Sequence, residues 1–66
     1  MSKPRITPIQ REIVKLIDDG FDTEGIAREL HRGKWGVKDH IRKLCREFNC
    51  PMRELPAKTG ITRGEG

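Results

Sequence analysis

Long apolar runs are absent from this 66-residue chain, and this absence already excludes several classes of protein. No segment approaches the roughly 18 consecutive apolar residues of a membrane-spanning helix. The first four residues are not followed by the apolar segment that a secretory signal peptide contains. We therefore expect a soluble cytoplasmic protein with no membrane partner.

Cysteine and histidine are scarce, at two residues each. Cys45, Cys50, His31 and His40 match neither the C-x-x-C nor the H-x-x-x-H spacing of common metal sites. A disulfide between the two cysteines would distort a helix end, so we expect reduced thiols. The sequence also lacks a recognisable pair of catalytic acids or an activated nucleophile, and it is short for enclosing a cleft. It predicts a protein with no enzymatic activity, metal or cofactor.

Positive charge, in contrast, is abundant and concentrated. The formal net charge is +4. The segment from Arg28 to Arg46 contains seven Lys/Arg and two acidic residues, a local net charge of +5. Such a concentration is typical of a nucleic-acid-binding element. An anionic membrane surface or an acidic protein could use the same segment, so charge alone does not identify the partner.

The sequence contains no strand pattern and no internal repeat, and its periodicity predicts helices. Thr7, Pro8 and Gln10 predict a helix start with a capping box, and Gly20 predicts the end of that helix after residue 18 or 19. One face of this helix should be buried. It carries Ile9, Ile13, Leu16 and Ile17.

Two further helices follow with a short connection. Asp22 predicts the start of a helix over about residues 23–30, with Ile26, Ala27 and Leu30 facing inward. After residues 31–33, a third helix should run to a left-handed Asn49. Pro51 opens a short fourth helix over residues 52–55, which Pro56 is expected to stop.

These elements predict an all-α fold, a small bundle of three to four helices with a helix-turn-helix over residues 22–48 and no winged helix. We expect this helix-turn-helix domain to cover residues 5–56. The glycine-rich residues 57–66 have little to bury, and a disordered tail is expected there.

The third helix has two different faces. Val37, Ile41, Leu44 and Phe48 recur at spacings of four, three and four, which places them in one apolar stripe. Side chains on the opposite side offer hydrogen-bond donors, positive charge and an aromatic ring: Trp35, Lys38, Asp39, Arg42 and Arg46. For an arbitrary amphipathic helix, the ordinary interpretation of such a face is a solvated surface.

Residues 6–55 resemble a known DNA-binding domain. Several segments contribute to the match: Ile6, Thr7 and Pro8; Arg11, Glu12 and Ile13; Gly20; Ile26, Ala27, Arg28, Glu29 and Leu30; Val37, Lys38, Asp39, His40 and Ile41; and Arg46. Their combination resembles the helix-turn-helix domain of the LuxR/FixJ/GerE family of bacterial transcription regulators. Region four of sigma factors has a related pattern.

The resemblance implies a four-helix domain whose third helix is the recognition helix. It implies that Lys38, Asp39 and Arg42 face bases or phosphates, with Lys34 and Trp35 near the DNA backbone. The chain departs from the family pattern at Gly25, Arg32, Gly33 and Gly36. Pro56 shortens the last helix, which in many relatives supplies the dimer surface.

The residues also suggest individual roles. Lys38 and Arg42 can contact guanine or flanking phosphates, and Asp39 can accept a hydrogen bond from cytosine or orient Arg42 or Lys43. Trp35 could point outward with the basic residues or fold back over the core. Thr23 and the free amides at the start of the second helix could hold a phosphate. The remaining cations are expected to position the DNA backbone: Arg28, Arg32, Lys34, Lys43 and Arg46.

We therefore expect a sequence-specific double-stranded DNA-binding protein that regulates transcription in a bacterium or a bacterial virus. It would insert the third helix into the major groove, as a monomer or a weak homodimer on DNA. The alternative is an adaptor that uses the same fold to bind an acidic protein, such as RNA polymerase or another transcription component.

Overall fold

The computed structural model describes residues 6–61, and this part of the chain is helical with no β-strand. Helix α1 covers Pro8–Asp18, α2 covers Thr23–Leu30, α3 covers Lys34–Phe48 and α4 covers Leu55–Thr59. A 3-10 helix, η1, covers Met52–Glu54 directly before α4. The predicted all-α class is confirmed.

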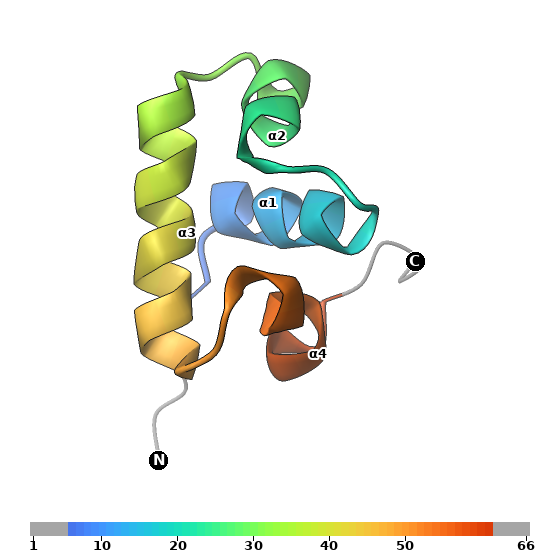
Figure 1. The fold of residues 1–66 in the computed structure, drawn as a ribbon, viewed down its shortest axis with the longest axis vertical. Coiled ribbons are helices and arrows are strands. Elements are labelled where there is room, and N and C mark those ends of the chain that lie inside the picture. Colours follow the sequence, from blue (N-terminus) through green and yellow to red (C-terminus); the bar gives the residue numbers. More distant parts are fainter. Residues whose placement is uncertain (1–5, 62–66) are drawn as a thin grey trace.

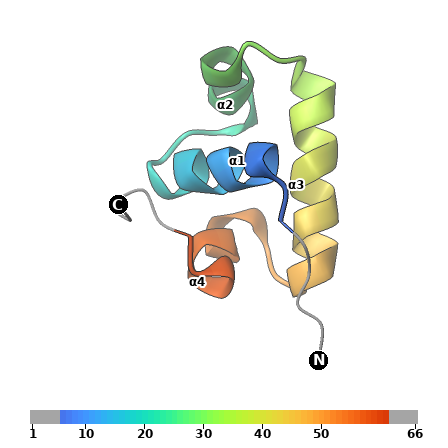
Figure 2. The ribbon, with the colours of Figure 1, turned by 180° about the vertical axis from the view of Figure 1, so that it is seen from behind.

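Helix α1 lies between α2 and α4, and all three pack on the same side of α3 (Figure 1). The view from behind shows the same order, with α3 standing alone at one edge of the molecule (Figure 2). The buried side chains of the four helices join in a single core. Helix α3 therefore has one long side against the core and one side that no described helix covers.

The start of α1 follows the predicted capping box. The backbone N–H of Gln10 donates to Thr7 Oγ1, and the backbone N–H of Thr7 donates to Gln10 Oε1, each over 3.2 Å. Pro8 occupies the first turn, where its missing N–H leaves no hydrogen bond unmade. Gly20 has a φ of +100° and ends the helix as expected.

The buried face of α1 is wider than the predicted one. Val14 was not expected in the core but is fully buried beside Ile13, whereas the expected Leu16 is only half-buried. The reason is the central position of α1, which packs against α2, α3 and α4. A helix covered from several directions buries more than the single stripe that amphipathic periodicity predicts.

The end of the fold also differs from the prediction. Pro56 does not stop the fourth helix, because it lies in the first turn of α4, which continues to Thr59. Gly60 ends α4 with a φ of +76°, and Ile61 beyond it is only 4% exposed and belongs to the core. The prediction of a disordered tail is therefore wrong for residues 57–61. Residues 62–66 lie outside the described part of the chain.

Candidate nucleic-acid interface

Helices α2 and α3 meet at a tight turn formed by residues 31–33 (Figure 1). His31 adopts the left-handed conformation with a φ of +54°, and its N–H bonds back to α2. Gly33 begins α3 without a side-chain cap. An ion pair of 3.7 Å joins Lys34 Nζ at the start of α3 to Glu24 on α2. Because both side chains are largely exposed, this pair adds little stability.

The two faces of α3 are those that the periodicity predicts. Val37, Ile41 and Leu44 are buried, and Phe48 is half-buried at the end of the same stripe. Every side chain predicted to point outward is exposed: Trp35, Lys38, Asp39, Arg42 and Arg46. We call these five residues the outer face of α3.

Trp35 points away from the core. Its side chain is 73% exposed, so the alternative in which the indole folds back over the core is wrong. The ammonium group of Lys38 lies over the ring, 5.3 Å from its centroid, and that of Lys34 lies 6.0 Å from it. Such cation–π contacts contribute about 0.5–1 kcal/mol at exposed sites. They hold the indole among the cations of the first two turns of α3.

Asp39 and Arg42 lie one turn apart on the outer face but differ in their partners. Asp39 Oδ2 forms an ion pair of 3.3 Å with Lys43 Nζ. Of the two partners that the sequence offered for Asp39, the structure selects Lys43. Arg42 makes no ion pair or hydrogen bond to another described residue. A shallow hollow of about 220 Å³ lies between Trp35, Lys38, Asp39 and Arg42.

The start of α2 is less suited to a phosphate than expected. Asp22 Oδ1 already accepts the Gly25 N–H over 2.8 Å, so a carboxylate occupies the position proposed for an anion beside Thr23. Glu24 adds a second negative charge in the first turn. At Gly25, a Cβ would lie 3.0 Å from the ring of Phe21, so any larger residue there requires this ring to shift.

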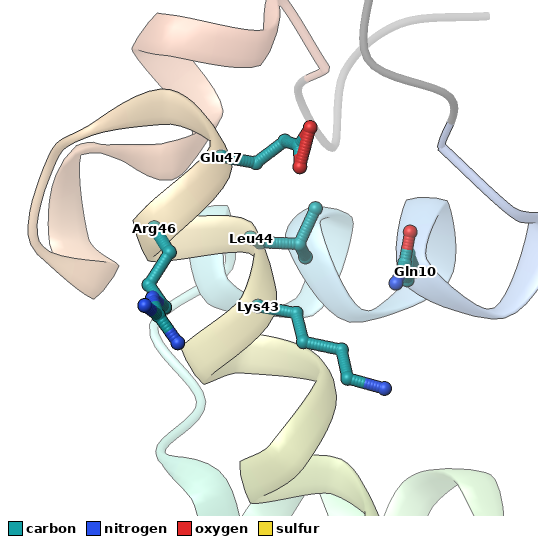
Figure 3. A pocket seen from close by; sticks show the side chains of 5 residues that line it. All are labelled: Gln10, Lys43, Leu44, Arg46 and Glu47. Atoms are coloured by element: carbon teal, nitrogen blue, oxygen red, sulfur yellow. The ribbon is translucent and has the colours of Figure 1, made fainter.

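A second hollow of about 340 Å³ lies beside α3, where the helix meets the start of α1 (Figure 3). Its lining mixes cations with an acid and an amide: Gln10, Lys43, Leu44, Arg46 and Glu47. Lys43 reaches across the hollow toward α1, whereas Arg46 turns to the other side of α3 (Figure 3). The carboxylate of Glu47 lies in the same hollow as Lys43 and repels anions. This hollow therefore favours anions less than the outer face of α3 does.

Gln10 is a residue of this region that sequence reasoning missed. Its Nε2 donates to Nδ1 of His40 over 3.3 Å, which joins the first turn of α1 to the middle of α3. The same side chain completes the capping box of α1 through its Oε1. No periodicity reveals a contact between residues 30 positions apart. Gln10 thus adds a polar contact between α1 and α3 to the apolar packing of the core.

The cysteines lie at the carboxyl end of α3, away from the outer face. The N–H of Cys50 donates to the carbonyl of Cys45 over 3.1 Å, and Asn49 between them is left-handed with a φ of +52°. Both thiols are free, and burial together with the nearby Cys50 raises the pKa of the Cys45 thiol. The backbone hydrogen bond and the left-handed Asn49 place Cys45 and Cys50 at the two positions that commonly form an apolar contact at a helix end.

Residues 6–61 contain no group of three or more metal-ligating side chains. Within the same residues, every helix is too short or too polar to span a bilayer.

Arg28 on α2 and Arg32 in the turn are exposed on the surface. In the described structure, the largest concentration of exposed cations is therefore on and next to α3.

No protein-family model matches the chain, and neither a curated protein nor a solved structure matches it.

Proposed function

We propose that this protein binds double-stranded DNA in a sequence-specific manner and regulates transcription in the cytoplasm of a bacterium, whether encoded by the bacterium or by a virus that infects it. One observation carries the proposal. The outer face of α3 presents Lys38, Arg42 and Arg46 together with an exposed tryptophan, on a helix that stands at the edge of the molecule. Neither catalysis nor a cofactor is part of the proposed role.

The dimensions of α3 suit the major groove. At 1.5 Å per residue its 15 residues extend about 22 Å, and the groove is about 12 Å wide, which admits one α-helix. Helices α1, α2 and α4 lie on the opposite side of α3 and do not obstruct its approach (Figures 1 and 2). The outer face can therefore enter the groove without rearrangement of the core.

Within this proposal the cations divide into two groups. Lys38 and Arg42 lie near the middle of the outer face and contact base edges. The others lie at its margins, in the turn before α3 or on α2, and they neutralise phosphates on either side of the groove: Arg28, Arg32, Lys34, Lys43 and Arg46. Phosphate contacts fix the position of the protein on the duplex without reading its sequence.

We further propose that the chain is a relative of the LuxR/FixJ/GerE regulators that binds as a monomer, or as a weak homodimer formed on DNA. Residues in the same order as in that family support this relationship: Thr7 and Pro8 at the start of α1, Gly20 after it, and the matching residues of α2 and α3. If two copies bind a palindrome, their half-sites should be centred about 34–36 Å apart, which is one turn of the duplex.

The test is the affinity for a random-sequence duplex measured by fluorescence anisotropy at several salt concentrations. We expect binding that weakens steeply with salt, because each phosphate neutralised contributes about 0.9 to the slope of log K against log salt. On a duplex that carries a preferred site, selected from a randomised library, Lys38→Ala and Arg42→Ala should each weaken binding by about 5-fold or more.

Lys58→Ala is the matched control, since it also removes one exposed cation but lies on α4, outside the proposed interface. It should bind nearly as tightly as the parent. Circular dichroism should show unchanged helix content in all three variants. Parent-like binding by both α3 variants would contradict the placement of α3 in the groove.

A second candidate function is an adaptor that binds an acidic component of the transcription machinery, such as RNA polymerase. The observation in its favour is the 73% exposure of Trp35, since tryptophan is enriched in the centres of protein interfaces. The same anisotropy series separates the two functions. An adaptor should show no binding to random duplex at low salt, whereas a DNA-binding protein should bind it measurably.

A further inference from the structure

We propose that Asp39 and Arg42 determine specificity by reading two neighbouring G·C base pairs, Asp39 through the amino group of cytosine and Arg42 through guanine. This inference rests on the proposed DNA-binding function and goes beyond it, because it names the bases. Three observations support it: the free guanidinium of Arg42, the ion pair of Asp39, and the hollow that they share with Trp35 and Lys38.

Arg42 has the properties of a guanine-reading residue. It is exposed near the middle of α3, and no ion pair or hydrogen bond within residues 6–61 engages its guanidinium. A free guanidinium can place two parallel N–H donors on O6 and N7 of guanine, which is the commonest specific contact in the major groove. Arg46, one turn further on, is nearer the carboxyl end of α3 and suits a phosphate.

Asp39 selects against most base edges because its carboxylate only accepts hydrogen bonds. Opposite O4 of thymine or N7 and O6 of guanine it would face another acceptor, which is repulsive. The amino group of cytosine instead offers a donor with no acceptor beside it on that base's edge. The ion pair with Lys43 uses one of the roughly four acceptor positions of the carboxylate and offsets part of its repulsion from phosphates.

The hollow gives both residues a defined place. Trp35 forms one wall, and the ammonium of Lys38 lies against its ring, 5.3 Å from the centroid. Asp39 and Arg42 are three residues apart, which is about 4.5 Å along the helix axis. Successive base pairs are about 3.4 Å apart in the duplex. The two side chains therefore reach neighbouring base pairs when α3 lies along the groove.

The experiment is a selection from a randomised duplex library, followed by affinity measurements on duplexes that differ at single base pairs. The parent should select sites with two adjacent G·C pairs. Asp39→Asn has nearly the same shape but matches the N6 and N7 groups of adenine. We expect it to shift the preference at one of the two positions from cytosine to adenine by about 10-fold, and Arg42→Ala to remove the preference at the other.

Ratios between duplexes are the decisive measure, because removing the charge of Asp39 also strengthens binding to every DNA sequence. Lys43→Gln is the matched control: it breaks the ion pair but leaves Asp39 in place, so it should retain the preference for cytosine. If Asp39 serves only to hold Lys43, Asp39→Asn will change the affinity for all duplexes equally, and the inference is then wrong.

Two outcomes separate this inference from the proposed function. A parent protein that binds duplex DNA but selects no adjacent G·C pairs overturns the inference and leaves the DNA-binding function intact. A parent protein that binds no duplex at low salt overturns both. Circular dichroism on each variant checks the fold, and the exposure of Asp39, Arg42 and Lys43 leads us to expect no loss of helix.

Discussion

Two glycines of this small fold have opposite consequences for stability. Gly36 lies in the first turn of α3, and a Cβ built there meets nothing within 4 Å. Gly20 also has open space, but its φ of +100° is unfavourable for any residue with a Cβ. Space therefore permits a side chain at both positions, whereas the backbone permits one only at Gly36.

We predict that Gly36→Ala raises the free energy of unfolding by about 0.5–1 kcal/mol, because alanine loses less backbone entropy in a helix. Gly20→Ala should lower it by about 1–2 kcal/mol. Urea denaturation followed by circular dichroism measures both values. A destabilised Gly36→Ala variant would show that the start of α3 is constrained by something other than helix propensity.

At the level of single side chains, the sequence predicts directions better than contacts. The spacing of Val37, Ile41 and Leu44 is enough to place Lys38 and Arg42 on the outside, because helix geometry fixes the angle between residues. It could not decide between the two positions of Trp35, since a long side chain at the margin can turn either way. The bond between Gln10 and His40 was equally inaccessible, because it depends on how α1 crosses α3.

At the level of elements, the helices with capping residues were predictable to within a residue or two. Thr7 and Asp22 mark the starts of α1 and α2, because their side chains accept hydrogen bonds from backbone N–H groups that a helix start leaves unpaired. Asn49 marks the carboxyl end of α3 through its left-handed backbone. The end of α4 was not predictable in this way. A proline can stop a helix or start one, and only the surroundings of Pro56 decide between them.

Ile61 shows what holds α4 in place. It follows Gly60 and lies in the core with Leu55, and its N–H donates to Thr59 Oγ1 over 3.3 Å. We predict that Ile61→Ala lowers the free energy of unfolding by about 2–5 kcal/mol, and Ile61→Val by about 0.5–1.5 kcal/mol. Urea denaturation of both variants tests this, with the exposed Lys58→Ala as a control that should change stability by less than about 0.5 kcal/mol.

Because a domain of this size has little stability to lose, Ile61→Ala could unfold entirely. The milder Ile61→Val then supplies the measurement. If both Ile61 variants are as stable as the parent, the packing of Ile61 in the core contributes nothing to stability, and this prediction is wrong.

At the level of the whole molecule, charge and shape are organised in the same direction. Helix α3 forms one edge of the molecule, and the turn between α1 and α2 lies at the opposite side (Figure 1). That turn and its flanks carry Asp18, Asp19 and Asp22, whereas the segment from Arg28 to Arg46 carries a net charge of +5. If the proposed DNA binding holds, the field of the duplex should orient such an asymmetric molecule so that α3 approaches first.

The small size of the fold gives the proposed DNA binding a consequence for stability. A ligand that binds only the folded state stabilises it by about 2.7 kcal/mol when its concentration is 100 times the Kd. For a domain of 60–100 residues, each kcal/mol raises Tm by about 4–8 °C. We predict that saturating duplex at low salt raises Tm by more than about 10 °C, as measured by differential scanning calorimetry.

The increase in Tm should depend on salt and on the outer face of α3. It should shrink as salt is raised, because the counterion release that drives binding becomes less favourable. It should also be smaller for Arg42→Ala at the same DNA concentration, while Lys58→Ala should retain it. An increase in Tm that Arg42→Ala leaves unchanged would mean that DNA contacts another surface, since binding through α3 cannot lose a central cation without weakening.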